Sequence, residues 1–252
     1  ENLDSEASGV IRRKGEDTVC PVDNRKGAAY VHCLLDIEDE GERLDSVGPA
    51  NYMLSYGWGY AVGDIVDTLV EYCGSTRLDP KRTYVWICSL CNNQHRVREG
   101  KVKGIDVPFE DFQSIFHRRV TGIGHILAMM SPWYDPLYIK RVWCVFELFT
   151  SSTNEKCKTT IVMPPRERED LSSSLGKNMN GADNVYKTLL ATNIENADAS
   201  VEEDKRNILR LVKNGLGFQT LNHKVNDLLR EWIGTSIGNA VQSRIGSSPD
   251  EA

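Results

Sequence analysis

The hydrophobic positions of this chain form short apolar runs that alternate with longer stretches of helical spacing. The runs have the length and the β-branched and aromatic content of buried strands. They lie at residues 51–56, 83–88, 125–130 and 158–163. Between and after these runs, apolar residues recur every three to four positions, and they predict helices at 61–73, 109–120 and 139–151.

Strands that alternate with helices imply a parallel sheet with right-handed crossovers. Because the runs are apolar on both faces, helices are expected to cover both sides of the sheet. The predicted fold class is therefore α/β, a flavodoxin-like parallel sheet covered by helices on both faces, with a helical C-terminal extension.

Other segments have weaker patterns. Residues 28–37 could form a strand or a short helix, 89–106 predict a long polar loop, 166–183 a loop or weak helix, 185–191 a short helix or strand, and 192–200 a final edge strand and turn.

Three parts follow along the chain. Residues 1–26 are polar without periodicity and predict a flexible lead-in, 27–200 form one α/β domain, and 201–246 form its helical extension. Ser200 and Glu203 have the spacing of a capping box that opens the extension. Its last helix carries an apolar stripe of Phe218, Leu221, Val225, Leu228, Leu229 and Trp232. We expect this stripe to dock on the domain's own helices, and a partner surface is the alternative.

Composition narrows the classes of function. The formal net charge of −6 argues against nucleic acid as a partner, because neutralising phosphates needs a basic surface. No apolar run approaches the roughly 20 residues that span a bilayer. Seven cysteines is an odd number, and several lie in apolar segments, which favours reduced thiols in the cytoplasm over a disulfide framework.

The segment 138–148, Y-I-K-R-V-W-C-V-F-E-L, places a charged residue within an apolar helix face. Glu147 in that setting must be desolvated, paired or functional, because an unpaired buried charge is costly. The structural alternatives are a salt bridge to Lys140 or Arg141, or a hydrogen bond to Trp86 or a backbone amide.

The order of these motifs is similar to that of a known family. A first strand ends in Ser55-Tyr56, a later strand ends in Ser131-Pro-Trp-Tyr134, and a helix then carries W-C-x-x-E-L with Glu147. This order resembles the TIR (Toll/interleukin-1 receptor) domain. The resemblance implies a TIR-like sheet and an NAD⁺ glycohydrolase or cyclase in which Glu147 is catalytic. NAD⁺ would be the substrate with no further cofactor, and self-association or a TIR-type partner would activate the enzyme.

A second resemblance covers residues 84–95. Y-V-W-I-C-S-L-C-N-N-Q-H is similar to the W-I-D-x-x-C-I-N-Q signature of the fungal heterokaryon-incompatibility (HET) domain, and Arg141-Val-Trp143 through Glu147 is similar to its R-x-W-x-x-x-E segment. The chain departs from both families. Cys88 stands where the HET signature has Asp, and Gly57-Trp58-Gly59 stands where active TIR domains often have Arg or Lys.

Cleavage of the nicotinamide–ribose bond passes through a cationic, oxocarbenium-like state that a nearby carboxylate can stabilise. Aromatic side chains could stack on the bases of NAD⁺, and the glycines could let backbone amides approach phosphate. Asn92 and Gln94 could face the ligand from the second strand's loop. The predicted substrate-binding residues are Ser55, Tyr56, Gly57, Trp58, Asn92, Gln94, Trp133 and Trp143.

Other chemistry has less support. Cys88-x-x-Cys91-x-x-x-His95 lacks a fourth ligand at recognisable spacing, so a core thiol is the better interpretation of Cys88 and no metal site is predicted. The alternative to an enzyme is a non-catalytic TIR/HET-like interaction module, or a structural subunit of a larger complex.

Overall fold

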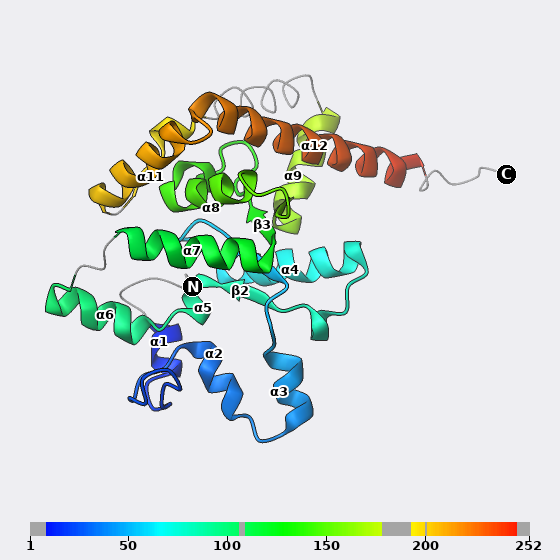
Figure 1. Cartoon of the computed structure of the whole chain (residues 1–252). Helices are drawn as coiled ribbons and strands as arrows, with labels where there is room; N and C mark the ends of the chain where they lie inside the picture. The colour runs from blue at the N-terminus through cyan, green and yellow to red at the C-terminus, as the bar shows by residue number, and fades with distance from the viewer. Residues whose placement is uncertain (1–8, 106–108, 178–192, 200, 246–252) are drawn as a thin grey trace.

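A parallel sheet of four strands is the centre of the fold (Figure 1). The computed structural model describes residues 9–105, 109–177, 193–199 and 201–245. The strands are β1 (Tyr52–Ser55), β2 (Val85–Ile87), β3 (His125–Met129) and β4 (Lys158–Val162). Their order is β2-β1-β3-β4, and every pairing is parallel. The prediction of an α/β fold with a flavodoxin-like parallel sheet is confirmed.

Alternate residues of the strands face opposite helical layers. On one face, Leu54 and Leu127 pack with α4 (Val62–Thr76). On the other face, Met53 and Ile126 pack with α7 (Phe109–Ile123). Side chains two positions apart on a strand point the same way, so Ser55 lies on the face of Met53.

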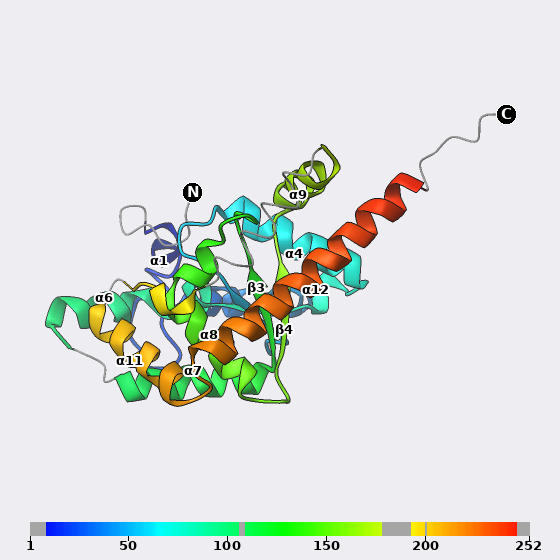
Figure 2. The ribbon, with the colours of Figure 1, turned by 90° about the horizontal axis from the view of Figure 1, so that it is seen from above.

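A second core lies above this face. It is built by α8 (Val142–Ser152), α9 (Pro165–Lys177), α11 (Glu202–Asn214) and α12 (Phe218–Ile245). Leu221, Val225 and Leu229 of α12 are buried against it, so the docking of the C-terminal stripe on the chain's own helices is confirmed. Burial of each of these side chains contributes roughly 1.5–3 kcal/mol. Figure 2 shows α12 crossing the domain and continuing past it.

The N-terminal residues fold against the domain. They form α1 (Val10–Lys14), α2 (Tyr30–Cys33), the 3-10 turn Leu34–Asp36 and α3 (Glu40–Ser46), which lie together at one end of the molecule (Figure 1). Cys20 is buried, and Val19 forms an antiparallel bridge with Lys26. The prediction of a flexible lead-in is therefore wrong for residues 9–26, and 1–8 lie outside the described residues. Of the two predictions for 28–37, the helix is confirmed.

Two predicted segments differ from the structure. The predicted loop 89–106 contains α5 (Cys88–Cys91) and α6 (Gln94–Lys103). Helix α6 has few apolar residues, so its sequence has no helical pattern of hydrophobic positions. Ion pairs and contacts with the N-terminal segment stabilise it instead. The predicted edge strand at 192–200 is a 3-10 turn, Ile194–Asn196, followed by a single bridge between Arg141 and Asp198.

The remaining helices and turns test the weaker sequence predictions. For 166–183, the helix is confirmed up to Lys177. Residues 185–191 and Ser200 of the capping box lie outside the described residues. Two further 3-10 turns, Pro80–Arg82 and Leu137–Lys140, precede β2 and α8. None of the helices described is long and apolar enough to cross a membrane. All seven cysteines are free thiols.

Candidate functional site

The carboxyl ends of β1 and β3 meet at the point where the chain reverses its direction of travel across the sheet. From β1 the chain goes to β2 on one side, and it returns to β3 on the other. Open α/β sheets bind ligands in the crevice at this topological switch point. Tyr60, just after β1, donates its hydroxyl proton to the carbonyl oxygen of Ser131, just after β3, at 2.7 Å. Ser55 pairs with Ala128 in the sheet.

A polar cluster of three side chains occupies this point. Ser55 donates a hydrogen bond to the carboxylate of Glu147, which reaches down from α8. The hydroxyl of Tyr138 lies 2.8 Å from the Ser55 oxygen. Since the one proton of Ser55 goes to the carboxylate, Tyr138 donates to Ser55. The result is a directed chain, Tyr138 to Ser55 to Glu147, within the core.

Burial controls the ionisation of this cluster. Only 7% of Glu147 is exposed, and burial raises the pKa of its carboxyl group to about 7. The hydrogen bond from Ser55 and the positive charge of Arg141 oppose that rise. Burial also raises the pKa values of Tyr138 and Cys144 well above their usual range. Near neutral pH, Glu147 therefore exchanges a proton where an exposed glutamate is fully ionised.

The partner of Glu147 differs from the alternatives that the sequence suggested. Its hydrogen bond comes from a serine on β1, because the parallel register brings Ser55 beneath α8. Lys140 instead pairs with Asp135 at 2.5 Å. Arg141 contributes through its charge and makes no ion pair in the described ranges.

Arg141 lies above the loop that follows β1. Its guanidinium carbon is 5.0 Å from the centre of the Trp58 ring, and Trp58 is 51% exposed. This cation–π contact joins the amino-terminal end of α8 to the loop. The TIR resemblance lacked a basic residue after Ser55-Tyr56, and Arg141 brings a cation to that loop from another element.

Tyr56 and Gly57 are packed within the same loop. Tyr56 is buried, and its hydroxyl donates to Ser89 at 2.9 Å. Cys144 of α8 donates to the Tyr56 carbonyl oxygen at 3.4 Å. A Cβ atom on Gly57 would lie 3.4 Å from the Tyr60 ring. Through the contacts of Glu147 with Ser55 and of Cys144 with Tyr56, α8 packs against the end of β1 and the start of the loop that follows it.

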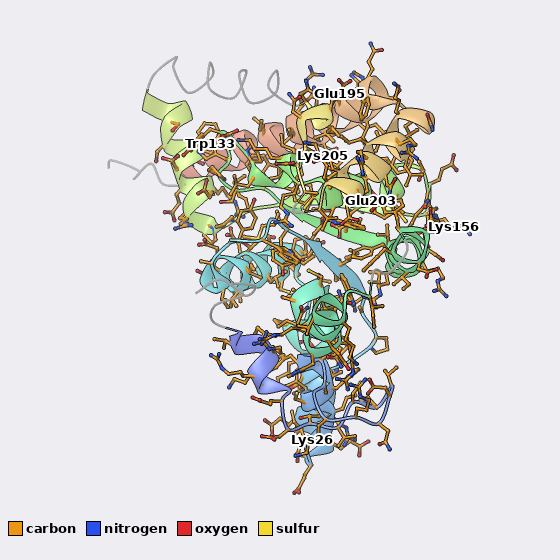
Figure 3. All side chains as sticks on the ribbon, turned by 90° about the vertical axis from the view of Figure 1, so that its left-hand side faces the viewer. Lys26, Trp133, Lys156, Glu195, Glu203 and Lys205 are labelled. Atoms are coloured by element: carbon orange, nitrogen blue, oxygen red, sulfur yellow. The ribbon has the colours of Figure 1, made fainter. Side chains whose placement is uncertain are left out.

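The two other tryptophans of the predicted set make packing contacts. Trp133 is buried, and its indole donates to Asp170 of α9 at 2.8 Å; Figure 3 shows it beside that helix. Trp143 is half-buried among aromatic rings, with Phe116 at 5.2 Å between ring centres, and its indole donates to Asp204. Neither has a described contact with Glu147, so their binding of substrate stays a prediction.

The predicted substrate-binding residues Asn92 and Gln94 follow β2. The amide oxygen of Asn92 accepts a hydrogen bond from Arg119 at 2.7 Å. Gln94 begins α6. Asn93 and His95 bind the N-terminal segment, at the Gly27 and Arg12 carbonyl oxygens respectively. In the described ranges no group of three His, Cys, Asp or Glu side chains could hold a metal ion.

Two cavities of the structure have linings that do not include the cluster. A cavity of 350 Å³ lies between Tyr134 and Asp198, and another of 470 Å³ lies between α1 and α6. Neither is lined by Glu147, Ser55 or Trp58. Because only 7% of Glu147 is exposed, a ligand can reach the carboxylate only if neighbouring side chains move.

Comparison of the chain with protein-family models, curated proteins and solved structures found no match. The likeness to the TIR domain accordingly rests on the motif around Glu147.

Sequence reasoning found Glu147 and Ser55 but not Tyr138 or Tyr60. A charge in an apolar helix and a serine that ends a strand are visible in the sequence. Tyr138 is the first residue of the apolar segment 138–148, but nothing in the sequence pattern distinguishes it as a functional residue. Its hydroxyl becomes important because the 3-10 turn Leu137–Lys140 holds it 2.8 Å from the Ser55 oxygen.

Proposed function

We propose that this protein cleaves the bond between nicotinamide and ribose in NAD⁺, with Glu147 as the catalytic carboxylate. The observation that carries the proposal is a buried carboxylate with a raised pKa at the topological switch point of the sheet. Strongly perturbed acids at such positions are concentrated in functional sites.

In the proposed reaction the C1′–N bond breaks, and its electron pair leaves with neutral nicotinamide. Water then bonds to C1′ and releases a proton, which gives ADP-ribose; attack by a ring nitrogen of the adenine would give a cyclic product. Ionised Glu147 stabilises the positive charge that develops on the ribose. The cationic nicotinamide ring favours that ionised form as substrate binds.

Ser55 and Tyr138 position the carboxylate. The hydrogen bond from Ser55 lowers the pKa of Glu147 and fixes one of its oxygens. Tyr138 in turn fixes the Ser55 hydroxyl. These two residues act through Glu147 and need not touch the substrate.

Trp58 and Arg141 are the proposed contacts for the rest of the dinucleotide. A base can stack on Trp58 in place of the guanidinium, which frees Arg141 to pair with the pyrophosphate. Because half of Trp58 is exposed and the charge of Arg141 acts on Glu147, movement of this pair would also open the site.

The setting of the reaction belongs to the proposal. Seven free thiols favour an intracellular, reducing compartment. Self-association is proposed to activate the enzyme, as the family resemblance implies, so the test must use concentrated protein.

The test is the loss of NAD⁺ from concentrated purified protein, followed by chromatography of the products. We expect the wild type to release nicotinamide and Glu147→Gln to lose about 10²–10³-fold in rate, the scale for removing one preorganised electrostatic contact. Glu155→Gln is the matched control, since Glu155 is exposed in the turn after α8 and is not one of the three residues of the cluster. Equal turnover in the Glu147→Gln and wild-type proteins would refute the catalytic role.

A second candidate is a non-catalytic interaction module. It is favoured by the 7% exposure of Glu147, since a residue with a purely structural role needs no access. Intact NAD⁺ at all protein concentrations, together with a defined oligomer, would support this candidate.

A further inference from the structure

A basic hollow lies where α1 meets α6, and we name it the α1–α6 hollow. Its volume is 470 Å³, within the range of roughly 300–1,000 Å³ that is usual for small-molecule sites. Its charged lining consists of Arg12, Arg13, Glu16, Arg98, Glu99 and Lys103. None of these residues belongs to the Glu147 cluster, so the hollow is separate from the proposed active site.

The joint that forms the hollow is held by specific contacts. His95 of α6 donates through Nε2 to the Arg12 carbonyl oxygen at 2.8 Å. Asn93 donates to the Gly27 carbonyl oxygen at 3.0 Å. Gly27 has a φ of +89°, and a Cβ atom there would lie 2.9 Å from the His95 ring. The backbone on both sides of the hollow is thus fixed before any ligand binds.

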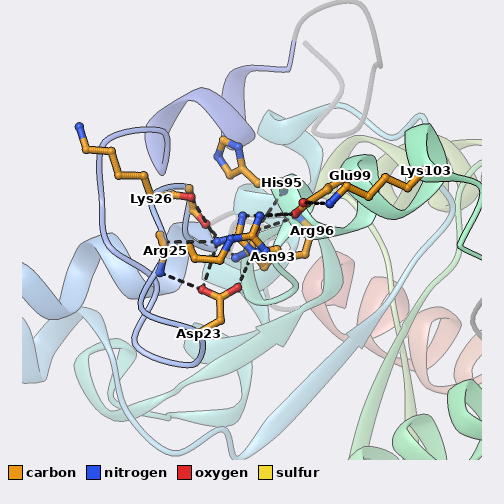
Figure 4. Close-up of polar contacts among 9 residues, drawn as sticks. Asp23, Arg25, Lys26, Asn93, His95, Arg96, Glu99 and Lys103 are labelled. Carbon is orange, nitrogen blue, oxygen red and sulfur yellow. Dashed lines mark hydrogen bonds and ion pairs between the residues drawn. The ribbon is translucent and has the colours of Figure 1, made fainter.

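The carboxylates of Asp23 and Glu99 in this joint already form ion pairs with basic side chains. Asp23 accepts from Arg96, and Glu99 accepts from Arg25 at 2.6 Å and Lys103 at 2.5 Å (Figure 4). These ion pairs lower the pKa of Glu99 to about 2, so Glu99 is ionised at neutral pH and its charge is paired with Arg25 and Lys103.

Three guanidinium groups remain without such partners. Arg12, Arg13 and Arg98 make no ion pair or side-chain hydrogen bond with the described residues. Glu16 is the one lining carboxylate without an ion pair there, and a single carboxylate cannot neutralise three cations. The chain as a whole has a net charge of −6, so this excess of positive charge is local. The side-chain contacts that hold the joint do not use the three guanidinium groups.

We propose that the α1–α6 hollow binds a small phosphorylated molecule that carries at least two phosphate groups. Guanidinium forks match phosphate oxygens in charge and in bidentate geometry. A ligand bridging Arg12 and Arg98 would join α1 to α6. The class includes nucleoside polyphosphates and inorganic pyrophosphate.

Calorimetric titration of the whole chain with ATP, pyrophosphate and adenosine tests the proposal. ATP and pyrophosphate should bind, adenosine should not, and added salt should weaken the binding. The triple variant Arg12→Gln, Arg13→Gln, Arg98→Gln should lose at least about tenfold in affinity, since charge-assisted hydrogen bonds are lost. Arg141→Gln should bind ATP and pyrophosphate as the wild type does, which separates this site from the pyrophosphate contact proposed for the NAD⁺ site.

The matched control is Arg118→Gln, Arg206→Gln, Arg210→Gln, which removes the same charge from exposed positions elsewhere. It should keep most of the affinity. Equal losses in the two triple variants would show diffuse charge attraction and overturn the proposal. Absence of ATP and pyrophosphate binding at millimolar concentration to the folded wild type would overturn it as well.

Discussion

Glu147 and Glu99 are both helical glutamates, and their surroundings move their ionisation in opposite directions. Glu147 lies on α8 in the core, where burial raises its pKa to about 7. Glu99 lies on α6 near the surface, where Lys103 and Arg25 lower its pKa to about 2. The difference teaches that solvent and nearby cations together set the pKa of a helical glutamate. Loss of solvent without an ion pair raises the pKa, whereas exposure to solvent together with neighbouring cations lowers it.

The pH dependence of stability is the largest expected expression of this contrast. Since the folded pKa of Glu147 exceeds its unfolded value of 4.5, the native state binds more protons between pH 4.5 and 7. Stability should therefore fall across that window, by about 3 kcal/mol for a shift of this size. Glu147→Gln should remove this fall, because a neutral amide still accepts from Ser55. Urea unfolding of both proteins from pH 4.5 to 8 measures it.

In that series the variant should gain stability over the wild type as pH rises, and the two should be similar near pH 4.5. Glu155→Gln is the control and should follow the wild type. Parallel stability curves for Glu147→Gln and the wild type would contradict a raised pKa.

Removal of the Ser55 hydroxyl should have the next largest effect. Ser55→Ala leaves Tyr138 and Glu147 each without a partner, at a cost of about 1–3 kcal/mol. Because the Ser55 hydrogen bond lowers the pKa of Glu147, its loss should raise that pKa further. Urea unfolding measures the first effect and its pH dependence measures the second.

Ser151→Ala is the matched control for this change. Ser151 is a buried serine of α8 that donates to the Leu148 carbonyl oxygen and has no hydrogen bond with Glu147 among the described residues. It should lower stability without moving the pKa of Glu147. If Ser55→Ala were as stable as the wild type with an unchanged pH profile, the hydrogen-bond chain would be refuted.

The smallest effect is expected at Glu99, with the opposite sign in pH. Its lowered pKa means that its ion pairs stabilise the fold above about pH 4.5 and are lost as pH falls toward 2. The Glu99→Gln variant should therefore be slightly less stable than the wild type at neutral pH, and its stability should fall less as the pH is lowered. Thermal unfolding at low and high salt detects this, since screening removes surface ion pairs. A salt-independent change, or one matched by Glu16→Gln, would contradict the account.

The same contrast explains what the sequence could predict. Glu147 was visible because a charge within an apolar helix is conspicuous, and the four strands were visible because buried runs of parallel sheets are continuous. Helix α6 was missed because its stability comes from Glu99, Lys103 and distant Arg25, not from an apolar face. The cation near Ser55 was missed because Arg141 reaches Trp58 across the fold.

The ionisation of Glu147 is the claim on which both the stability and the proposed chemistry depend. It can be observed by ¹³C NMR titration of protein labelled at the glutamate carboxyl carbon, with Glu147→Gln used to assign the signal. The account predicts one glutamate signal that titrates with a midpoint near pH 7 and is missing from the variant. A Glu147 signal that titrates near pH 4.5, like an exposed glutamate, would contradict it.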